Sequence, residues 1–132
     1  MARRNYVAPD GAVYEVDEAK APPEWRPETS EEAAKAKAGA PPHDLSLLLA
    51  HQPRSIYGAA EAGFDLQLSG HTHGGQFYPW NLFVPLQQPY TAGLDQAGPM
   101  WIYTSRGTGY WGPPLRLGAP SEITRLRFVG AA

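Results

Sequence analysis

The sequence predicts an α/β fold built on a mixed sheet with few helices. Two apolar runs, residues 45–50 and 65–69, flank a stretch of helical pattern, which is the arrangement of a strand–helix–strand unit. A third apolar run, residues 100–105, predicts a further strand of the same sheet. The chain has 132 residues, of which 42% are hydrophobic, so it can form one domain with a modest core.

We expect the chain to have two parts, residues 1–44 and residues 45–132. The first part begins with two short β-type stretches on either side of Pro9-Asp10-Gly11, and these predict a hairpin because glycine accepts a positive φ in the turn. Residues 17–28 are polar and rich in proline, which indicates a loop. Together these features predict a small N-terminal hairpin with a proline-rich connection behind it.

A short helix is expected at the end of the first part. Thr29 and Glu32 have the spacing of a capping box, in which each side chain bonds a backbone N–H of the first helical turn. The helix is expected over residues 30–38, and Gly39 is a typical residue for its end. The polar residues that follow, up to residue 44, indicate a linker to the second part.

The second part is expected to alternate strands and connections. The run over residues 45–50 is almost continuously apolar, which predicts a strand buried on both faces. Residues 54–62 suit a helix that ends at Gly63, and residues 77–99, with four prolines, predict a long irregular segment. Alternating apolar and polar side chains over residues 122–129 predict a final strand.

Composition excludes several classes of function. A net charge of −2 is unlike the strongly basic face of a nucleic-acid-binding protein. The absence of cysteine excludes disulfides and thiolate metal sites. No apolar run approaches the roughly 18 residues of a membrane span, and the N-terminus lacks the apolar stretch of a signal peptide. A cytoplasmic and a membrane-associated location both remain open.

Three of the four histidines follow the ends of predicted strands. His51 comes directly after the run at 45–50, and His71 and His73 lie between glycines directly after the run at 65–69. Imidazole is the commonest metal ligand in proteins, and ligands of open α/β sheets bind beyond the carboxyl ends of strands, so we expect a metal site here. The alternatives are a chance His-x-His pair and a lone histidine that bonds a strand-end carbonyl. His43, in the polar linker, is expected to be exposed and without function.

A second glycine-rich loop follows the run at residues 100–105. Arg106, between Ser105 and Gly107, could bind a phosphate through two N–H groups, or it could pair with a carboxylate within a tight loop. Aromatic residues gather in the same half of the chain and are expected mostly to pack, with some beside the metal loop. The apolar segment 77–99 suggests a lipid-like substrate or a membrane surface as a neighbour.

Two sequence blocks then resemble one family. The first block is Leu47-Leu48-Leu49-Ala50-His51-Gln52-Pro53, and the second is Asp65-Leu66-Gln67-Leu68-Ser69-Gly70-His71-Thr72-His73-Gly74-Gly75-Gln76. Together they are similar to the C-terminal half of calcineurin-like metallophosphoesterases. The tail from Tyr103 to Arg116, with Glu122-Ile123-Thr124, resembles a bacterial branch whose members often follow membrane segments. The resemblance implies the C-terminal half of a four-layer αββα sandwich that hydrolyses a phosphoester.

The resemblance also implies roles for the three histidines. His51 and His71 would bind the second of two divalent metal ions, and His73 would bind the first. The ions would be of the Mn, Fe, Zn or Mg class. A hydroxide that bridges them would attack the phosphorus in line while the ions stabilise the developing charge.

The sequence departs from the family in its N-terminal motifs. It has no D-x-H block, no G-D block with a bridging Asp and no G-N-H-D/E block, and Asp10, Asp17 and Asp44 lie in none of those contexts. Hard divalent ions prefer oxygen ligands, which these blocks would supply. We therefore expect a phosphoester hydrolase that is incomplete as this chain alone. The alternatives are a non-catalytic module that binds a single ion, and a degenerate fragment that self-associates through an exposed sheet edge.

Overall fold

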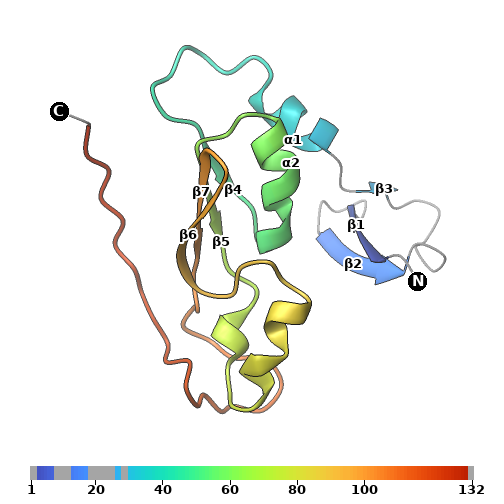
Figure 1. The fold of residues 1–132 in the computed structure, drawn as a ribbon, viewed down its shortest axis with the longest axis vertical. Helices are drawn as coiled ribbons and strands as arrows, with labels where there is room; N and C mark the ends of the chain where they lie inside the picture. The colour runs from blue at the N-terminus through green and yellow to red at the C-terminus, as the bar shows by residue number, and fades with distance from the viewer. Residues whose placement is uncertain (1–2, 8–12, 18–25, 28–29, 131–132) are drawn as a thin grey trace.

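The computed structural model describes residues 3–7, 13–17, 26–27 and 30–130, which form two separate sheets (Figure 1). The N-terminal sheet has the strand order β2-β1-β3. In it, β1 (Arg3–Val7) pairs antiparallel with β2 (Val13–Asp17) and with the two-residue strand β3 (Arg26–Pro27). These two antiparallel strands lie at the two stretches expected to form a hairpin, and the Pro9-Asp10-Gly11 turn lies outside the described residues.

The predicted first helix is α1 (Ser30–Lys37). Gly39 follows it with a φ of 77°, a left-handed conformation that glycine adopts without strain. Thr29, the expected N-cap, lies outside the described residues. Lys37 ties the helix to the second part of the chain, because its ammonium donates to the carbonyl of Gly63 and lies 5.4 Å from the ring centroid of Phe64.

The main sheet is mixed, as expected from the predicted fold class, and has the strand order β4-β5-β7-β6. Its parallel strands β4 (Leu47–Leu49), β5 (Leu66–Ser69) and β7 (Met100–Thr104) correspond to the three predicted runs. The antiparallel edge strand β6 (Gly93–Ala97) precedes β7 in a hairpin. One segment links β4 to β5, and it consists of a 3-10 turn, Pro53–Ser55, and the helix α2 (Ile56–Glu61).

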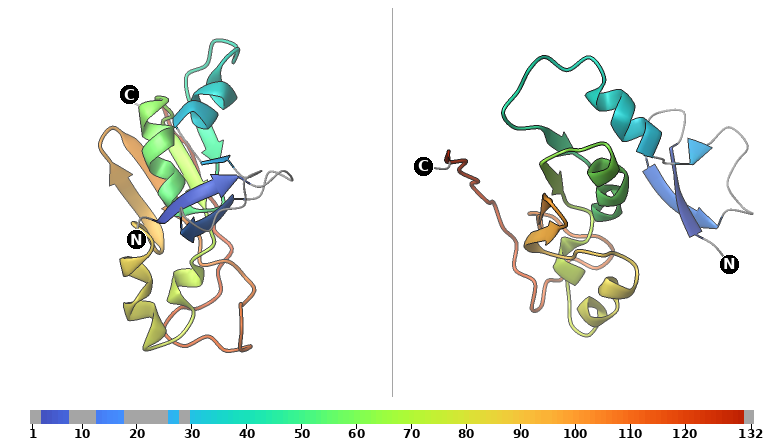
Figure 2. Two further views of the ribbon diagram at one scale, coloured as in Figure 1. Left: turned by 90° about the vertical axis from the view of Figure 1, so that its right-hand side faces the viewer. Right: turned by 45° about the horizontal axis from the view of Figure 1, so that its top comes forward.

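The hydrophobic core lies between α2 and one face of this sheet (Figures 1 and 2). Ile56 and Ala59 of α2 pack against Met100 and Ile102 of β7, and all four side chains are fully buried. Leu48 of β4 packs against the same cluster. A single short helix therefore covers this face, and it fixes the strand–helix–strand unit that carries two of the predicted site residues.

Much of the opposite face of the sheet is exposed among the described residues, although the tail contacts it where Glu122 and Thr124 hydrogen-bond the Tyr103 hydroxyl. Leu49 is 75% exposed. Its register partners on the neighbouring strands are Leu68, Tyr103 and Leu94, which lie on the same face of the sheet. The expectation that residues 45–50 are buried on both faces is therefore wrong. Strand β4 is an edge strand with α2 on one side only, and among the described residues there is no second sheet of the kind a four-layer sandwich requires.

Two further expectations for the second part need correction. The segment 77–99 is less irregular than predicted, because it contains the 3-10 turns Trp80–Leu82 and Val84–Leu86 and the strand β6. The final strand expected over residues 122–129 is absent, and the chain there runs as an extended tail without a strand partner (Figure 1). Within the described part of the chain, no helix is long and apolar enough to span a bilayer.

Candidate functional site

His51 and His71 lie side by side because their parallel strands end at the same edge of the sheet. His51 is two residues beyond the end of β4, and His71 is two residues beyond the end of β5. The Gly70 amide donates to the His51 carbonyl at 3.0 Å, which extends the pairing of the two strands to the histidines. The two imidazole centroids are 5.1 Å apart, and the rings meet edge to face at 76°.

All three predicted ligands line one pocket of about 300 Å³. His51 and His71 are exposed within it, and His73 is half-buried. The remaining walls come from Thr72 and from the segment after it, in which the lining residues are Trp80, Val84, Gln87, Gln88 and Trp111. The structure therefore brings together the three histidines that the sequence singles out and adds an aromatic and amide wall opposite them.

The loop that carries His71 and His73 has an unusual backbone. Three residues other than glycine have positive φ angles, namely His71 at 69°, His73 at 51° and Gln76 at 57°. Such conformations cost about 1–3 kcal/mol each and persist where the surroundings hold them. Thr72, which is almost fully buried between the two histidines, provides one such constraint because its hydroxyl donates to the Thr91 carbonyl at 2.6 Å.

Gln76 joins this loop to the loop that follows β7. Its fully buried side-chain amide donates to the carbonyls of Trp111 and Pro113 at 2.7 and 3.1 Å, and its oxygen accepts from the Trp111 amide at 2.7 Å. Trp111 is thereby held as a wall of the pocket. Gln76 stands in the same sequence motif as the two histidines, but no local pattern indicates its role, because its partners lie 35 and 37 positions later.

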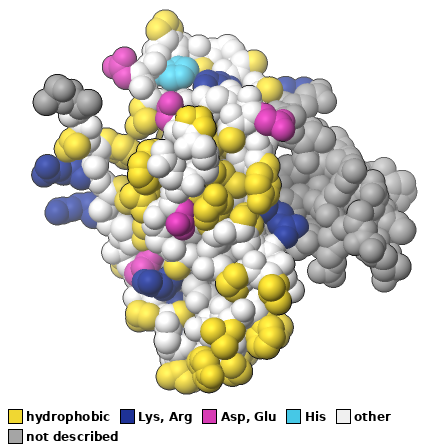
Figure 3. Space-filling view, in the orientation of Figure 1, with side chains coloured by type: hydrophobic (Ala, Val, Ile, Leu, Met, Phe, Trp, Pro, Cys, Tyr) yellow, Lys and Arg dark blue, Asp and Glu magenta, His cyan; other side chains and the backbone are white. Residues whose placement is uncertain are grey.

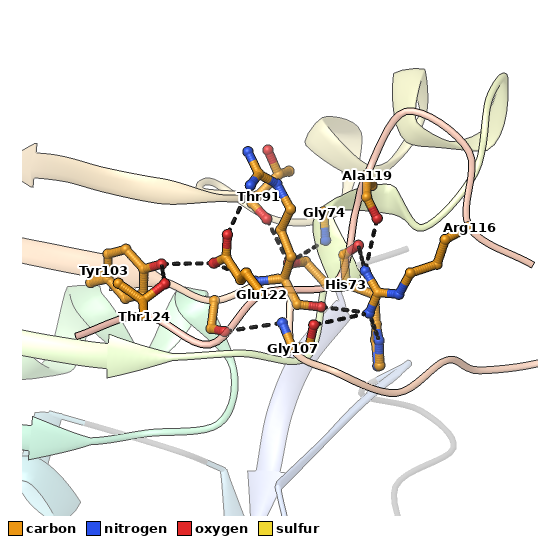
Figure 4. A network of polar contacts seen from close by, with 12 residues as sticks. His73, Gly74, Thr91, Tyr103, Gly107, Arg116, Ala119, Glu122 and Thr124 are labelled. Carbon is orange, nitrogen blue, oxygen red and sulfur yellow. Dashed lines mark hydrogen bonds and ion pairs between the residues drawn. The ribbon is translucent and has the colours of Figure 1, made fainter. Parts of the chain in front are cut away.

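Arg116 is a second residue that sequence reasoning missed. Its half-buried guanidinium lies against His73, with Nη2 at 3.2 Å from Nδ1 of the ring (Figure 4). Burial, followed by the positive charge of Arg116, lowers the pKa of His73 below its ordinary value of 6.5. His73 is therefore neutral at pH 7, and neutral imidazole is the form that binds metal ions.

Arg106, the predicted phosphate-binding residue, forms an ion pair with Glu122 in this structure. The two side chains meet at 2.8 Å, and the Arg106 amide donates to the same carboxylate at 3.1 Å. The Tyr103 hydroxyl also donates to Glu122, at 2.7 Å, and this bond is the main reason that the pKa of Glu122 is below its ordinary value (Figure 4). This pairing corresponds to the second of the two roles considered for Arg106, and binding of phosphate by Arg106 stays a prediction.

The donor set of the pocket is incomplete for a metal centre. The lining residues include three imidazoles and no carboxylate. Among the described residues, no three side chains of His, Cys, Asp or Glu converge closely enough to hold an ion together. His43 lies elsewhere, exposed and bonded to the Pro41 carbonyl at 2.8 Å. The described residues therefore fit part of a metal site, with His51 and His71 as its most closely spaced pair.

Comparison with known proteins gives several related sequences. Over 86 residues the chain is 52% identical to an uncharacterized metallophosphoesterase of Helicobacter pylori (strain J99), which covers 64% of this chain and 23% of the relative. It is 46% identical over 95 residues to a bovine (Bos taurus) transmembrane protein with metallophosphoesterase domain, covering 70% of this chain and 21% of the relative. It is 42% identical over 88 residues to the phosphodiesterase YaeI of Escherichia coli (strain K12), covering 63% of this chain and 32% of the relative.

These relatives are much longer than the matched segment, and the chain spans about a quarter of the length of the Helicobacter pylori relative, 23%. No family model matches the chain, and no solved structure matches it. The matched segment covers most of the chain at 38–52% identity in several relatives that are named metallophosphoesterases. Over this segment, the chain belongs to the metallophosphoesterase family and represents part of a metallophosphoesterase domain.

Proposed function

We propose that this chain contributes the histidine part of the metal site of a phosphoester hydrolase, with His51, His71 and His73 as the ligands. The observation that carries the proposal is that all three line one pocket, in which His51 and His71 are the closely spaced pair. Two parallel strands and one strained loop bring three imidazoles to one pocket, and the lowered pKa of His73 favours its neutral form. The names of the relatives, metallophosphoesterase and phosphodiesterase, support a phosphoester as the substrate class.

Hydrolysis is assigned to a whole metallophosphoesterase domain and not to this chain alone. Divalent ions of the Mg or Mn class require oxygen ligands, and the described residues of the pocket include no carboxylate. The three imidazoles and the wall formed by Trp80 and Trp111 would be one side of the complete site. The other ligands would come from residues outside the described pocket.

A second function is favoured by the same donor set. Three imidazoles without a carboxylate suit zinc or a similar ion better than magnesium, so the chain could act as a non-catalytic module that binds a single ion. The close His51–His71 pair, with ring centroids 5.1 Å apart, is the observation that favours this function. The number of ions bound per chain and the presence of turnover distinguish this single-ion module from the phosphoester hydrolase.

Metal content of the purified chain tests these proposals. We expect at most one zinc ion per chain by elemental mass spectrometry, with loss of the ion in His51→Ala and His71→Ala and no loss in the control His43→Ala. Unchanged metal content in both site variants would overturn the histidine site. Two ions per chain together with turnover of an aryl phosphodiester would show a complete enzyme, and one ion without turnover would favour the single-ion module.

We further propose that the apolar segment beside the pocket contacts a lipid surface. Residues 74–94 include no charged side chain, and the two 3-10 turns expose large apolar groups. Leu82 is 60% exposed, Phe83 50% and Leu86 81%, and apolar side chains gather at the end of the molecule that these turns occupy (Figure 3). Aromatic and aliphatic side chains without charge are typical of surfaces that insert into the membrane interface.

A further inference from the structure

His71 lies at the centre of a γ-turn, a reversal of the backbone over three residues. The amide of Thr72 donates to the carbonyl of Gly70 at 2.8 Å, and His71 between them has a φ of 69°. A γ-turn with a positive φ at its central residue is rare and strained. Its presence at a proposed ligand means that a contact outside the turn holds the backbone in this conformation.

The side chain of Thr72 makes such a contact. Thr72 is almost fully buried, its hydroxyl donates to the Thr91 carbonyl at 2.6 Å, and the Gly74 amide donates to the hydroxyl oxygen at 3.4 Å. Thr91 is 19 positions further along the chain and follows Gln88, which lines the pocket. The hydroxyl therefore ties the histidine loop to the segment that forms the amide wall of the pocket.

The two histidines of the loop differ in how their backbone is held. After Thr72, the Gly75 amide donates to the Thr72 carbonyl at 2.8 Å, and the Gln76 amide donates to the His73 carbonyl at 3.0 Å, so backbone bonds close the turn around His73. At His71 the γ-turn bond is the backbone bond that spans the residue. Because a buried hydrogen bond is comparable in free energy to the strain of one positive φ, the Thr72 hydroxyl can decide the conformation of His71.

We propose that Thr72 is a positioning residue for His71, whose left-handed backbone it holds through its hydroxyl. This backbone directs the His71 ring toward His51, with the ring centroids 5.1 Å apart. A turn relaxed to a negative φ would change the direction of the Cα–Cβ bond and separate the two rings. The proposal rests on the proposed function, because it concerns two of the imidazoles assigned to the metal, but the conformation of His71 can be measured without metal and without turnover.

Nuclear Overhauser effects (NOEs) in the metal-free chain test the proposal. A residue with a positive φ has a short distance between its amide and α protons, so we expect a strong intraresidue NOE at His71. We also expect NOEs between the ring protons of His51 and His71. In Thr72→Val, which keeps the branched side chain but removes the hydroxyl, both signals should weaken. Thr72→Ser keeps the hydroxyl and should give the wild-type pattern.

Two controls separate positioning from general stability. Thr108→Val makes the same substitution at an exposed threonine, and Ile56→Val removes a methylene from the hydrophobic core. Both variants should keep the wild-type NOEs at His71. Three results would overturn the proposal: wild-type NOEs in Thr72→Val, their loss in Thr72→Ser or in either control, and a weak intraresidue NOE at His71 in the wild-type chain.

Two further measurements keep the outcome clear. If Thr72→Val fails to fold, the wild-type chain and Thr72→Ser decide the question, and a Thr72 hydroxyl proton that exchanges rapidly with water would then count against the proposal. Calorimetry should show zinc binding roughly tenfold weaker in Thr72→Val than in Thr72→Ser, and equal affinities would contradict positioning. If the wild-type chain binds no zinc, the proposed function fails, while the NOEs still decide the role of Thr72.

Discussion

The side chain of Gln76 and the backbone of Trp111 exchange two hydrogen bonds, each 2.7 Å long. This is the pairing that two adjacent β-strand residues make, but one partner is a side-chain amide. Because Gln76 is fully buried, both bonds are shielded from water. The contact fixes the distance between the histidine loop and the aromatic wall of the pocket, so this glutamine determines the shape of the site without lining it.

Replacement of Gln76 by glutamate should destabilise the protein. The carboxylate keeps the size of the side chain but has no N–H to donate, so the carbonyls of Trp111 and Pro113 lose a buried partner. We expect a loss of about 1–3 kcal/mol in the free energy of unfolding, measured by chemical denaturation at pH 7. Gln96→Glu on the exposed side of β6 is the control, and an equal effect in both variants would contradict this role for Gln76.

Gly75 should not tolerate alanine, for a steric reason that can be separated from its backbone conformation. A Cβ at Gly75 would lie 2.3 Å from Cα and 2.4 Å from Cβ of Asn81. Gly98 also has a positive φ, 62° against 80° at Gly75, but has nothing within 4 Å of the same position. Thermal and chemical unfolding should therefore show Gly75→Ala to be less stable than Gly98→Ala by about 1–3 kcal/mol. Equal losses would mean that strain alone decides.

Glu122 should make stability fall in acid. Its pKa in the folded protein is below the ordinary value of 4.5, chiefly because the Tyr103 hydroxyl donates to it. The contribution of this carboxylate to stability is therefore complete above pH 4.5 and is lost as the pH falls through the lower folded pKa. Thermal midpoints measured from pH 7 downward should converge for wild type and Glu122→Gln below pH 4.5. Glu61→Gln is the control. A difference in thermal midpoint between wild type and Glu122→Gln that stays constant across this pH range would contradict the assignment.

The two 3-10 turns should determine binding to lipid vesicles. The double variant Leu82→Ser/Leu86→Ser removes two exposed apolar groups, so its partition onto vesicles of mixed zwitterionic and anionic phospholipid should fall roughly tenfold. Cosedimentation measures this partition. Ile123→Ser, a change of a 92% exposed residue in the tail, is the control. Absence of partition by the wild-type chain would remove the lipid surface as a partner.

The strands and the second helix could be predicted because their signal is local. Apolar runs gave β4, β5 and β7, and Gly63 ended α2 at the expected place, with a φ of 75°. Exposure of Leu49 was not predicted, because burial depends on what packs against a strand and not on the strand itself. The alternation over residues 122–129 failed for the same reason, since a strand exists only beside a pairing neighbour.

Some contacts of the candidate site could be predicted from the sequence and others could not. His51 and His71 were brought together in the prediction because parallel strands end at one edge, and the structure places their rings 5.1 Å apart. Gln76 and Arg116 carried no such signal. Arg116 lies 43 positions from His73 in the sequence, and nothing local to either residue indicates the contact. Contacts of this range follow only from the path of the loop after β7.

The left-handed backbone at His71 and His73 has a consequence for the evolution of this loop. Glycine adopts such φ angles more readily than histidine, so glycine at these positions would give a less strained loop. A population selected only for folding would therefore lose these histidines, at position 71 and at position 73 alike. Retention of both imidazoles under mutational drift would require selection on the pocket itself, and a library varied at these two positions would measure that requirement directly.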